Sequence, residues 1–226
     1  MFNQGPTPPP PNTISTYHAL LADDDQRWNA YLPVGTPSIV TYSFAETDSL
    51  FDPYYEVDQR TPFTPEQRAH FRTALNEFST LSGLSFVEVA AQGMLQVQNV
   101  LGSDLGGYAF FPGVYEESRE MVPARINIED DGPYAPGTTN YGTLLHEIGH
   151  ASGLKHPFEG DLILDASRDN YAWTVMSYTS GGALRDQLKP YDIHAIRHLY
   201  GQSSSATVTL SADGQTLLVR GGAGPD

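Results

Sequence analysis

The sequence predicts an α+β fold in which a sheet, arranged as an α/β-type layer, is covered by helices. Three observations support this prediction: several segments rich in β-branched and aromatic residues, a well-marked amphipathic helix between them, and a second helix after the strands. A chain of 226 residues is long enough for one substantial domain with its own core. Hydrophobic residues make up 39% and charged residues 17%, which is typical of a globular protein.

The first clear elements are a strand and the helix that follows it. Residues 38–46 (SIVTYSFAE) are rich in β-branched and aromatic side chains and predict a strand. Thr64 can cap a helix, Pro65 fits its first position and Gln67 completes a capping box. Apolar residues then repeat at helical spacing until Gly83, which ends the run; they are Phe71, Leu75, Phe78 and Leu81.

The remaining expected elements are further strands and a helix near the N-terminus. Residues 84–90 and 94–101 predict strands, followed by the segments 106–113 (GGYAFFPG) and 124–130 (ARINIED). Near the N-terminus, a helix is expected around residues 18–27. Together these segments give a sheet layer with helices packed on it.

Composition excludes several classes of function. The net charge of −15 argues against nucleic acid and anionic membrane as partners, although it is compatible with divalent cations. The absence of cysteine removes disulfides, thiolate catalysis and cysteine-type zinc sites. The sequence contains no run of 18 or more apolar residues, so no membrane span is predicted. Residues 1–17 predict a flexible proline-rich tail, and this N-terminus lacks the features of a signal peptide.

The stretch HEIGHASGLKHP, residues 146–157, contains the candidate metal-binding and catalytic residues. A helix is expected to begin at Thr139 or Asn140, and His146 and His150 lie four residues apart on one of its faces. This spacing lets two imidazole nitrogens reach one ion at about 2.0–2.1 Å.

A third histidine follows a glycine that can end this helix. Gly153 can adopt a left-handed conformation and turn the chain so that His156 becomes a third nitrogen ligand. Three histidines leave a fourth position for water, which is the arrangement of a catalytic zinc site. Glu147 can then accept the proton of that water. The alternative is a helix whose histidines are only polar surface groups.

The residues His146, Glu147, His150, Gly153 and His156 match the pattern H-E-x-x-H-x-x-G-x-x-H, and the chain therefore resembles the metzincins. Within that clan, three features together resemble the serralysins, a group of secreted bacterial metalloproteases. They are Pro157 after the third histidine, VMSY with Met176 and Tyr178, and the closing DIHAIRHLYG at residues 192–201. The resemblance covers roughly residues 38–201, within a catalytic domain expected over residues 18–201.

The resemblance implies a metzincin-like zinc protease domain with a twisted mixed sheet, an active-site helix and a Met-turn. It implies a secreted endopeptidase that holds one Zn²⁺ on the three histidines and uses Glu147 as general base. Tyr178 would lie near zinc and stabilise the oxyanion, whereas Met176 would pack beneath the ligands; the alternative for Tyr178 is a structural tyrosine of the turn. An extended polypeptide substrate would add a strand to an edge formed by Gly107, Tyr108, Ala109, Phe110 and Phe111. The alternative is an ordinary edge strand.

Residues 202–226 are expected to form C-terminal strands, and RGGAGPD at their end fits the opening of one glycine-rich calcium repeat. Serralysins continue into a calcium-binding β-roll, so Ca²⁺ is expected only if such a roll follows. Either the chain was cut at the entrance to the roll, which is favoured, or it is a short relative without one. In this family an export signal lies beyond the roll.

Several alternatives remain beside this interpretation. A catalytically silent zinc-bearing binding or adhesion module is one, and an astacin-like or matrixin-like protease is another. His194 and His198 stand four apart, but core packing explains their helix better than a second metal. The acidic runs at residues 22–25 and 129–131 are read as solvated loops. A monomer is expected, with a protein inhibitor as a further candidate partner, and latency would require an Asp or His in residues 1–30 to block the cleft.

Overall fold

The computed structural model describes residues 12–45, 59–102, 106–115, 117–129, 132–203, 207–211 and 216–220. Its helices are η1 (Tyr17–Leu20, a 3₁₀ helix), α1 (Pro65–Leu81), α2 (Thr139–His150) and α3 (Pro190–Tyr200). Its strands are β1 (Asn12–Ile14), β2 (Ser38–Phe44), β3 (Gln59–Thr61), β4 (Leu84–Glu88), β5 (Leu95–Leu101), β6 (Gly107–Phe110), β7 (Gly113–Val114), β8 (Met121–Val122), β9 (Ala124–Glu129), β10 (Leu162–Leu164), β11 (Thr207–Leu210) and β12 (Leu217–Arg220).

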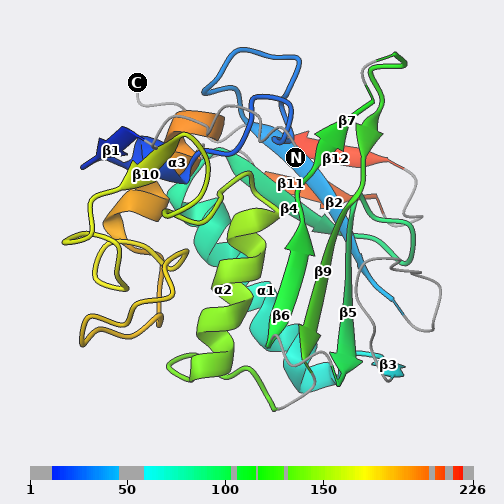
Figure 1. Ribbon diagram of the computed structural model, residues 1–226. Helices are drawn as coiled ribbons and strands as arrows, with labels where there is room; N and C mark the ends of the chain where they lie inside the picture. Colours follow the sequence, from blue (N-terminus) through cyan, green and yellow to red (C-terminus); the bar gives the residue numbers. More distant parts are fainter. Residues whose placement is uncertain are drawn as a thin grey trace, which may run out of the picture.

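The central element is a mixed sheet with the strand order β4-β2-β5-β9-β6, and β3 pairs with the outer part of β5 (Figure 1). Strands β4, β2, β5 and β9 run parallel to one another, whereas β6 runs antiparallel to β9 and β3 antiparallel to β5. The predicted α+β arrangement with a mixed sheet is therefore confirmed. The segment expected to form an edge does so, and Phe111 lies just beyond the end of β6.

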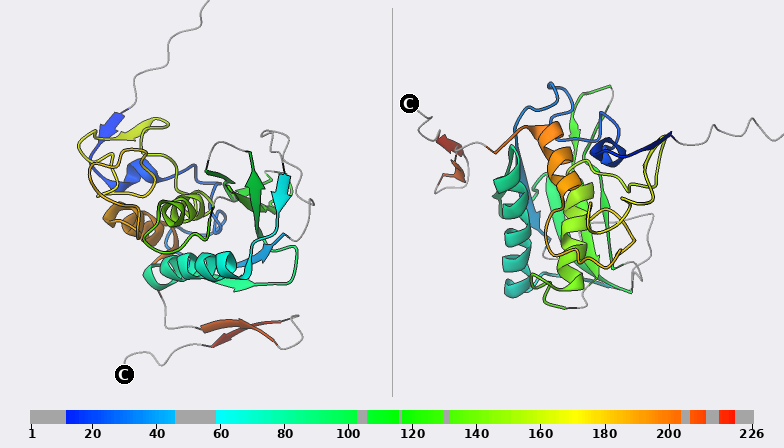
Figure 2. Two further views of the ribbon diagram at one scale, coloured as in Figure 1. Left: turned by 90° about the horizontal axis from the view of Figure 1, so that it is seen from below. Right: turned by 90° about the vertical axis from the view of Figure 1, so that its left-hand side faces the viewer.

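The three α-helices lie in front of the same face of this sheet (Figure 2). Helices usually cover the face of a parallel sheet, because the side chains on that face are apolar and must be buried. The core between helices and sheet is one continuous cluster that includes Phe71, Phe78, Val97, Ile126, Leu144 and Ile148. The helix that carries two of the histidines therefore rests on the interior of the domain.

Helix α1 begins as predicted. The Thr64 hydroxyl accepts a hydrogen bond from the Gln67 amide, and the Gln67 side chain accepts one from the Thr64 amide, which completes the capping box. The Gln67 side chain also accepts from Asn99 Nδ2 at 2.9 Å, which ties the helix start to β5.

The end of α1 requires glycine for a different reason than the sequence suggests. Gly83 does not have a left-handed backbone. A Cβ at this position would instead lie 2.0 Å from the carbonyl oxygen of Tyr200. Close approach of α3, rather than a turn conformation, excludes a side chain at Gly83.

Two predicted helix boundaries are corrected. Helix α2 is capped by Thr138, one residue before the expected cap, and its hydroxyl accepts from the Tyr141 amide at 3.2 Å. The helix expected over residues 18–27 is reduced to η1, and turns follow it. Buried Arg27 donates to the backbone oxygen of Asn29, and Asn29 donates to Leu199 O, so this segment gains its hydrogen bonds as a loop tied to α3.

The peripheral strands lie outside the main sheet. Strand β1 pairs in parallel with β10, and β11 pairs with β12 as an antiparallel hairpin (Figure 2). Strands expected within residues 202–226 are therefore present as β11 and β12, whereas the proline run and the glycine-rich end fall outside the described residues. No helix in the described ranges is long and apolar enough to cross a membrane.

Candidate metal centre

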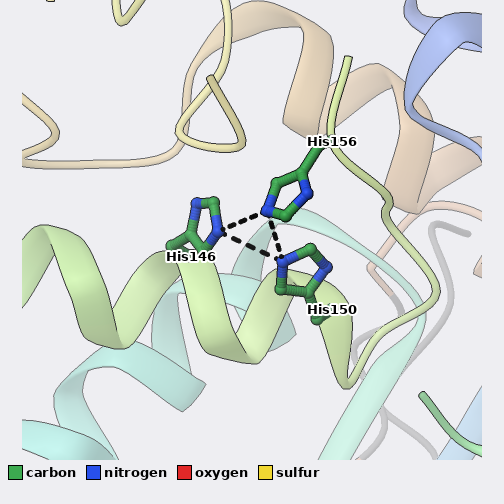
Figure 3. A group of neighbouring side chains, drawn as sticks. All are labelled: His146, His150 and His156. Carbon is green, nitrogen blue, oxygen red and sulfur yellow. Dashed lines mark hydrogen bonds between the residues drawn. The ribbon is translucent and has the colours of Figure 1, made fainter. Parts of the chain in front are cut away.

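Helix α2 and the turn after it bring three histidines together. His146 and His150 lie a turn apart on α2, and the helix ends before Gly153, whose φ of +89° is a left-handed conformation. A Cβ at Gly153 would also lie 2.8 Å from Gln26 O. The chain reverses there, and His156 faces the two helical histidines (Figure 3). The predicted function of Gly153 as the turning point is confirmed.

The three Nε2 atoms form a triangle with each side 3.1 Å long. Tetrahedral ligands about 2.0–2.1 Å from a zinc ion stand roughly 3.3 Å from one another, so this triangle fits such an ion. Among the described residues, these histidines are the one group of three or more His, Cys, Asp or Glu side chains close enough to share a metal. The prediction that these three histidines converge is therefore confirmed.

The other ring nitrogens fix the orientation of the ligands. His146 Nδ1 donates to Val175 O at 2.9 Å, and His150 Nδ1 donates to Leu154 O at 2.8 Å. Because a carbonyl only accepts, both rings carry their proton on Nδ1 and keep the Nε2 lone pair free for a metal.

His156 has an acidic neighbour in place of a carbonyl. Glu159 Oε1 lies 2.8 Å from His156 Nδ1, although the angle between them is outside hydrogen-bond geometry. The carboxylate therefore faces the outer side of the His156 ring. Sequence reasoning did not identify Glu159, although it follows the motif by three residues.

Burial keeps the two helical histidines neutral. It lowers the pKa of His150 to about 3 and holds the pKa of His146 well below its usual value. Nearby histidines lower both pKa values further. Neutral imidazole is the form that binds a metal, so the pair is ready to bind one at neutral pH.

Glu147 lies next to the histidines as an uncompensated acid. Its side chain is buried, and Oε2 has no hydrogen-bond partner within the described structure. Burial raises the pKa of Glu147 to about 8, and the charge of Arg185 opposes this shift. A cation at the histidines would favour the charged carboxylate. Burying a hydrogen-bond acceptor without a partner costs free energy, so the unpaired Oε2 points to a group that binds beside Glu147.

Aromatic side chains border the histidines. The Tyr178 hydroxyl lies 2.9 Å from His156 Nε2, and the side chain is 62% exposed. Phe158 stacks on the His156 ring with an interplanar angle of 7°. Phe111 makes an edge contact with His150. Tyr178 thus lies within reach of the centre, whereas Phe158 was not identified from the sequence.

A methionine and an aspartate support the centre from inside the domain. Met176 is fully buried in a turn, and a Cβ at Gly149 of α2 would lie 2.5 Å from its sulfur. Asp192 accepts hydrogen bonds from the Thr174 hydroxyl and the Val175 amide at 2.6 and 2.9 Å. Since Val175 O accepts from His146, α3 supports one ligand through this turn.

The other candidate sites do not gather ligands. Tyr17 lies between the helical pair, with its ring 5.8 Å from His194 and its hydroxyl 3.5 Å from His198 Nδ1. Asp23 and Asp25 are exposed. In the second acidic run, Glu129 accepts from the Gly102 amide, and the two aspartates lie outside the described residues. Aromatic packing and solvated loops account for what is described of these groups.

A mixed sheet with an antiparallel edge strand, crossed by a helix that carries two of three convergent histidines, is consistent with a metzincin-like domain. No protein-family model matches the chain. Known proteins do: serralysin of Proteus mirabilis is 30% identical over an alignment of 225 residues, covering 82% of this chain and 44% of the relative. Serralysin B of Dickeya chrysanthemi is 29% identical (77% and 41% covered), and metalloprotease AprA of Pseudomonas entomophila (strain L48) is 30% identical (76% and 38% covered).

These matches identify the chain as serralysin-like, as its motifs predict. The chain spans less than half the length of these curated relatives.

Proposed function

We propose that the protein is a zinc endopeptidase that hydrolyses internal peptide bonds of extended polypeptides. One observation carries the proposal: three Nε2 atoms converge at 3.1 Å, and the residue after His146 is a buried glutamate whose Oε2 has no hydrogen-bond partner in the described structure. Histidine ligands with an adjacent base are the components of metal-assisted hydrolysis. The similarity to proteins named serralysin and metalloprotease supports the same reaction class.

In this proposal His146, His150 and His156 hold the ion. A zinc ion bound there supplies Lewis-acid polarisation of the scissile carbonyl and lowers the pKa of a nucleophilic water. Glu147 accepts the proton of that water and delivers it to the leaving amine. Its buried position keeps the carboxylate away from bulk water, which strengthens its interaction with the proton it carries.

Tyr178 and Met176 have different proposed functions. The Tyr178 hydroxyl, 2.9 Å from His156 Nε2, donates a hydrogen bond to the carbonyl oxygen as that oxygen gains negative charge. The side chain is 62% exposed, so its movement on substrate entry would displace little of the protein interior. Met176 is the structural residue of a Met-turn, where its buried thioether fills the space under Gly149.

The substrate is proposed to bind as an added strand along β6 and Phe111. Strand β6 pairs with β9 along one edge and is the last strand in the sheet order, and the substrate would pair along its other edge. A Cβ at Gly107 would lie 3.1 Å from Glu147 Cγ, so this edge passes beside the proposed base. Recognition through the main chain would allow many sequences to be cut.

The proposal also covers secretion, oligomeric state, inhibition, calcium and latency. The names of the relatives support a bacterial protease that acts on polypeptides. Secretion, a monomeric state and a protein inhibitor in the cleft are further parts of this proposal. Calcium would be required if a β-roll follows residue 226. Latency through residues 1–30 is tested by removing that tail: unchanged activity would exclude it.

The proposed function is tested by casein cleavage. Glu147→Ala is expected to lower the rate by about 10²–10⁴-fold, because general-base catalysis contributes that much. Zinc content measured by atomic absorption should stay near one per chain. Glu66→Gln removes an exposed acid in the first turn of α1 and serves as the matched control. A zinc-loaded wild type that cleaves nothing would favour the binding-module alternative instead.

A further inference from the structure

A pocket of about 400 Å³ lies at the Phe111 end of β6, and two of its lining residues contact His150 and His156. Phe111, which contacts the His150 ring, lines it, and so does Glu159, which faces His156. The segment after η1 and the loop that follows His156 form its other walls. The pocket is large enough for a long side chain, and it continues the proposed cleft.

The position of Glu147 indicates which half of a substrate reaches this pocket. Glu147 lies beside Gly107, at the start of β6, and the pocket lies at the other end, beside Phe111. In the proposed function Glu147 hands a proton to the leaving amine, which belongs to the C-terminal product. The C-terminal half of the substrate therefore lies toward Gly107, and the N-terminal half lies toward the pocket.

The pocket combines apolar walls with an excess of negative charge. Leu21 and Phe111 offer apolar surface, while the carboxylates of Asp23, Glu159 and Asp161 line the pocket. Such a lining suits a long side chain with an apolar stem and a cationic end.

The one lysine of the lining does not cancel this charge. Lys155 Nζ donates to the backbone oxygens of Ala19, Glu159 and Leu162 at 2.5, 2.6 and 3.0 Å and lies 3.5 Å from that of His156. Lys155 is half-buried in holding the loop after His156 together, and three acidic residues line the pocket beside this lysine and His18. The net charge of the whole chain, −15, has the same sign.

We propose that this pocket is a specificity site that receives a lysine or arginine side chain of the substrate, located before the scissile bond. The proposal rests on the proposed endopeptidase function and adds a substrate class to it: polypeptides with a basic residue in the N-terminal half of the cleaved segment. At about 3.3 Å per residue, a strand along β6 reaches the pocket roughly two to four residues before the cut.

Internally quenched peptides that are cut at one mapped bond test the proposal. Lysine, glutamine or glutamate is placed in turn at the second, third and fourth positions before that bond, and kcat/KM is measured with the zinc-loaded protein. At one of these positions, lysine should exceed glutamate by about 3- to 10-fold at low salt, as for partly exposed charge pairs. The ratio should shrink in 0.5 M salt, where the screening length falls to a few ångströms.

Substitutions of pocket residues test whether the lysine preference arises in the pocket. Asp23→Asn and Asp161→Asn should each lower the lysine-to-glutamate ratio, whereas Glu66→Gln on α1 should leave the ratio unchanged. The Kd values of the same peptides for Glu147→Gln protein, measured by fluorescence anisotropy, should show the same order. This second readout does not depend on turnover.

The outcomes separate the two proposals. Cleavage with equal kcat/KM for lysine, glutamine and glutamate overturns the specificity site and leaves the proposed function standing. A lysine preference that both pocket variants retain also overturns the assignment. If no peptide is cleaved by zinc-loaded protein, the proposed function fails, and the specificity site fails with it.

Discussion

Asp192 is the residue that connects the last helix to the metal centre. Its carboxylate accepts from the Thr174 hydroxyl, from the Val175 amide and from the Lys189 amide at the start of α3. The Val175 carbonyl in turn accepts from His146. A fully buried acid with three donors holds the backbone that orients one ligand, so it acts through its neighbours and not on substrate.

This aspartate gives a prediction for pH dependence. Burial raises the pKa of Asp192 from 3.8 to about 6, so the folded state binds this proton more tightly than the unfolded state. The contribution to stability is therefore complete below about pH 4 and is lost as the pH rises through 6, with an upper bound of about 3 kcal/mol. The free energy of unfolding of wild type minus that of Asp192→Asn should fall between pH 4 and 7.

Urea unfolding of the metal-free proteins measures this difference, and other titrations cancel because both chains share them. Asparagine keeps one oxygen to accept the backbone amides and remains neutral throughout. A difference that stays constant between pH 4 and 7 would contradict the raised pKa of Asp192.

At the scale of elements, α2 is in close contact with the turn at Met176. Gly149→Ala would place a Cβ 2.5 Å from the buried Met176 sulfur, so either the methionine or the helix must move. Overpacking costs about 1–3 kcal/mol, partly offset by the better helix propensity of alanine. Because the displaced turn orients His146, zinc affinity should fall by roughly 10–100-fold.

Competition with a chromogenic zinc chelator measures that affinity, with Gly113→Ala as the control. A Cβ at Gly113 would meet its nearest neighbour, Val122, at 3.8 Å, which is ordinary contact, so affinity and stability should be unchanged. Wild-type zinc affinity in Gly149→Ala would show that the Met176 contact does not support the ligands.

The elements also show what the sequence could predict. Helices α1 and α2 and the His146–His150 pair follow from local periodicity and caps, which act over a few residues. The loop at residues 21–32 was not predicted, because Asn29 finds its partner at Leu199 O, 170 residues away along the chain. The same holds for His146, whose orientation depends on Val175 O, so the three histidines were predictable while the groups that orient them were not.

For the whole molecule, the described residues divide into a domain built on the main sheet and a hairpin, β11–β12, beyond it (Figure 2). Side chains of β12 are exposed, and no described residue of the hairpin belongs to the core cluster. Gly201, by contrast, accepts from the Gly83 amide at 3.0 Å and closes α3 with a φ of +79°. The boundary of the stable unit therefore lies after Gly201.

Deletion of residues 204–226 tests this boundary, because it removes the hairpin and keeps the Gly83–Gly201 contact. Since little buried apolar surface is lost, the Tm of zinc-loaded protein should change by less than about 3 °C, which corresponds to under about 1 kcal/mol for a domain of this size. Zinc affinity should be unchanged. A cut after residue 199, which also removes buried Tyr200, is the matched comparison and should lower Tm strongly. If the shorter deletion lowers Tm as much as the longer one, the hairpin is part of the domain and supports the sheet through β4.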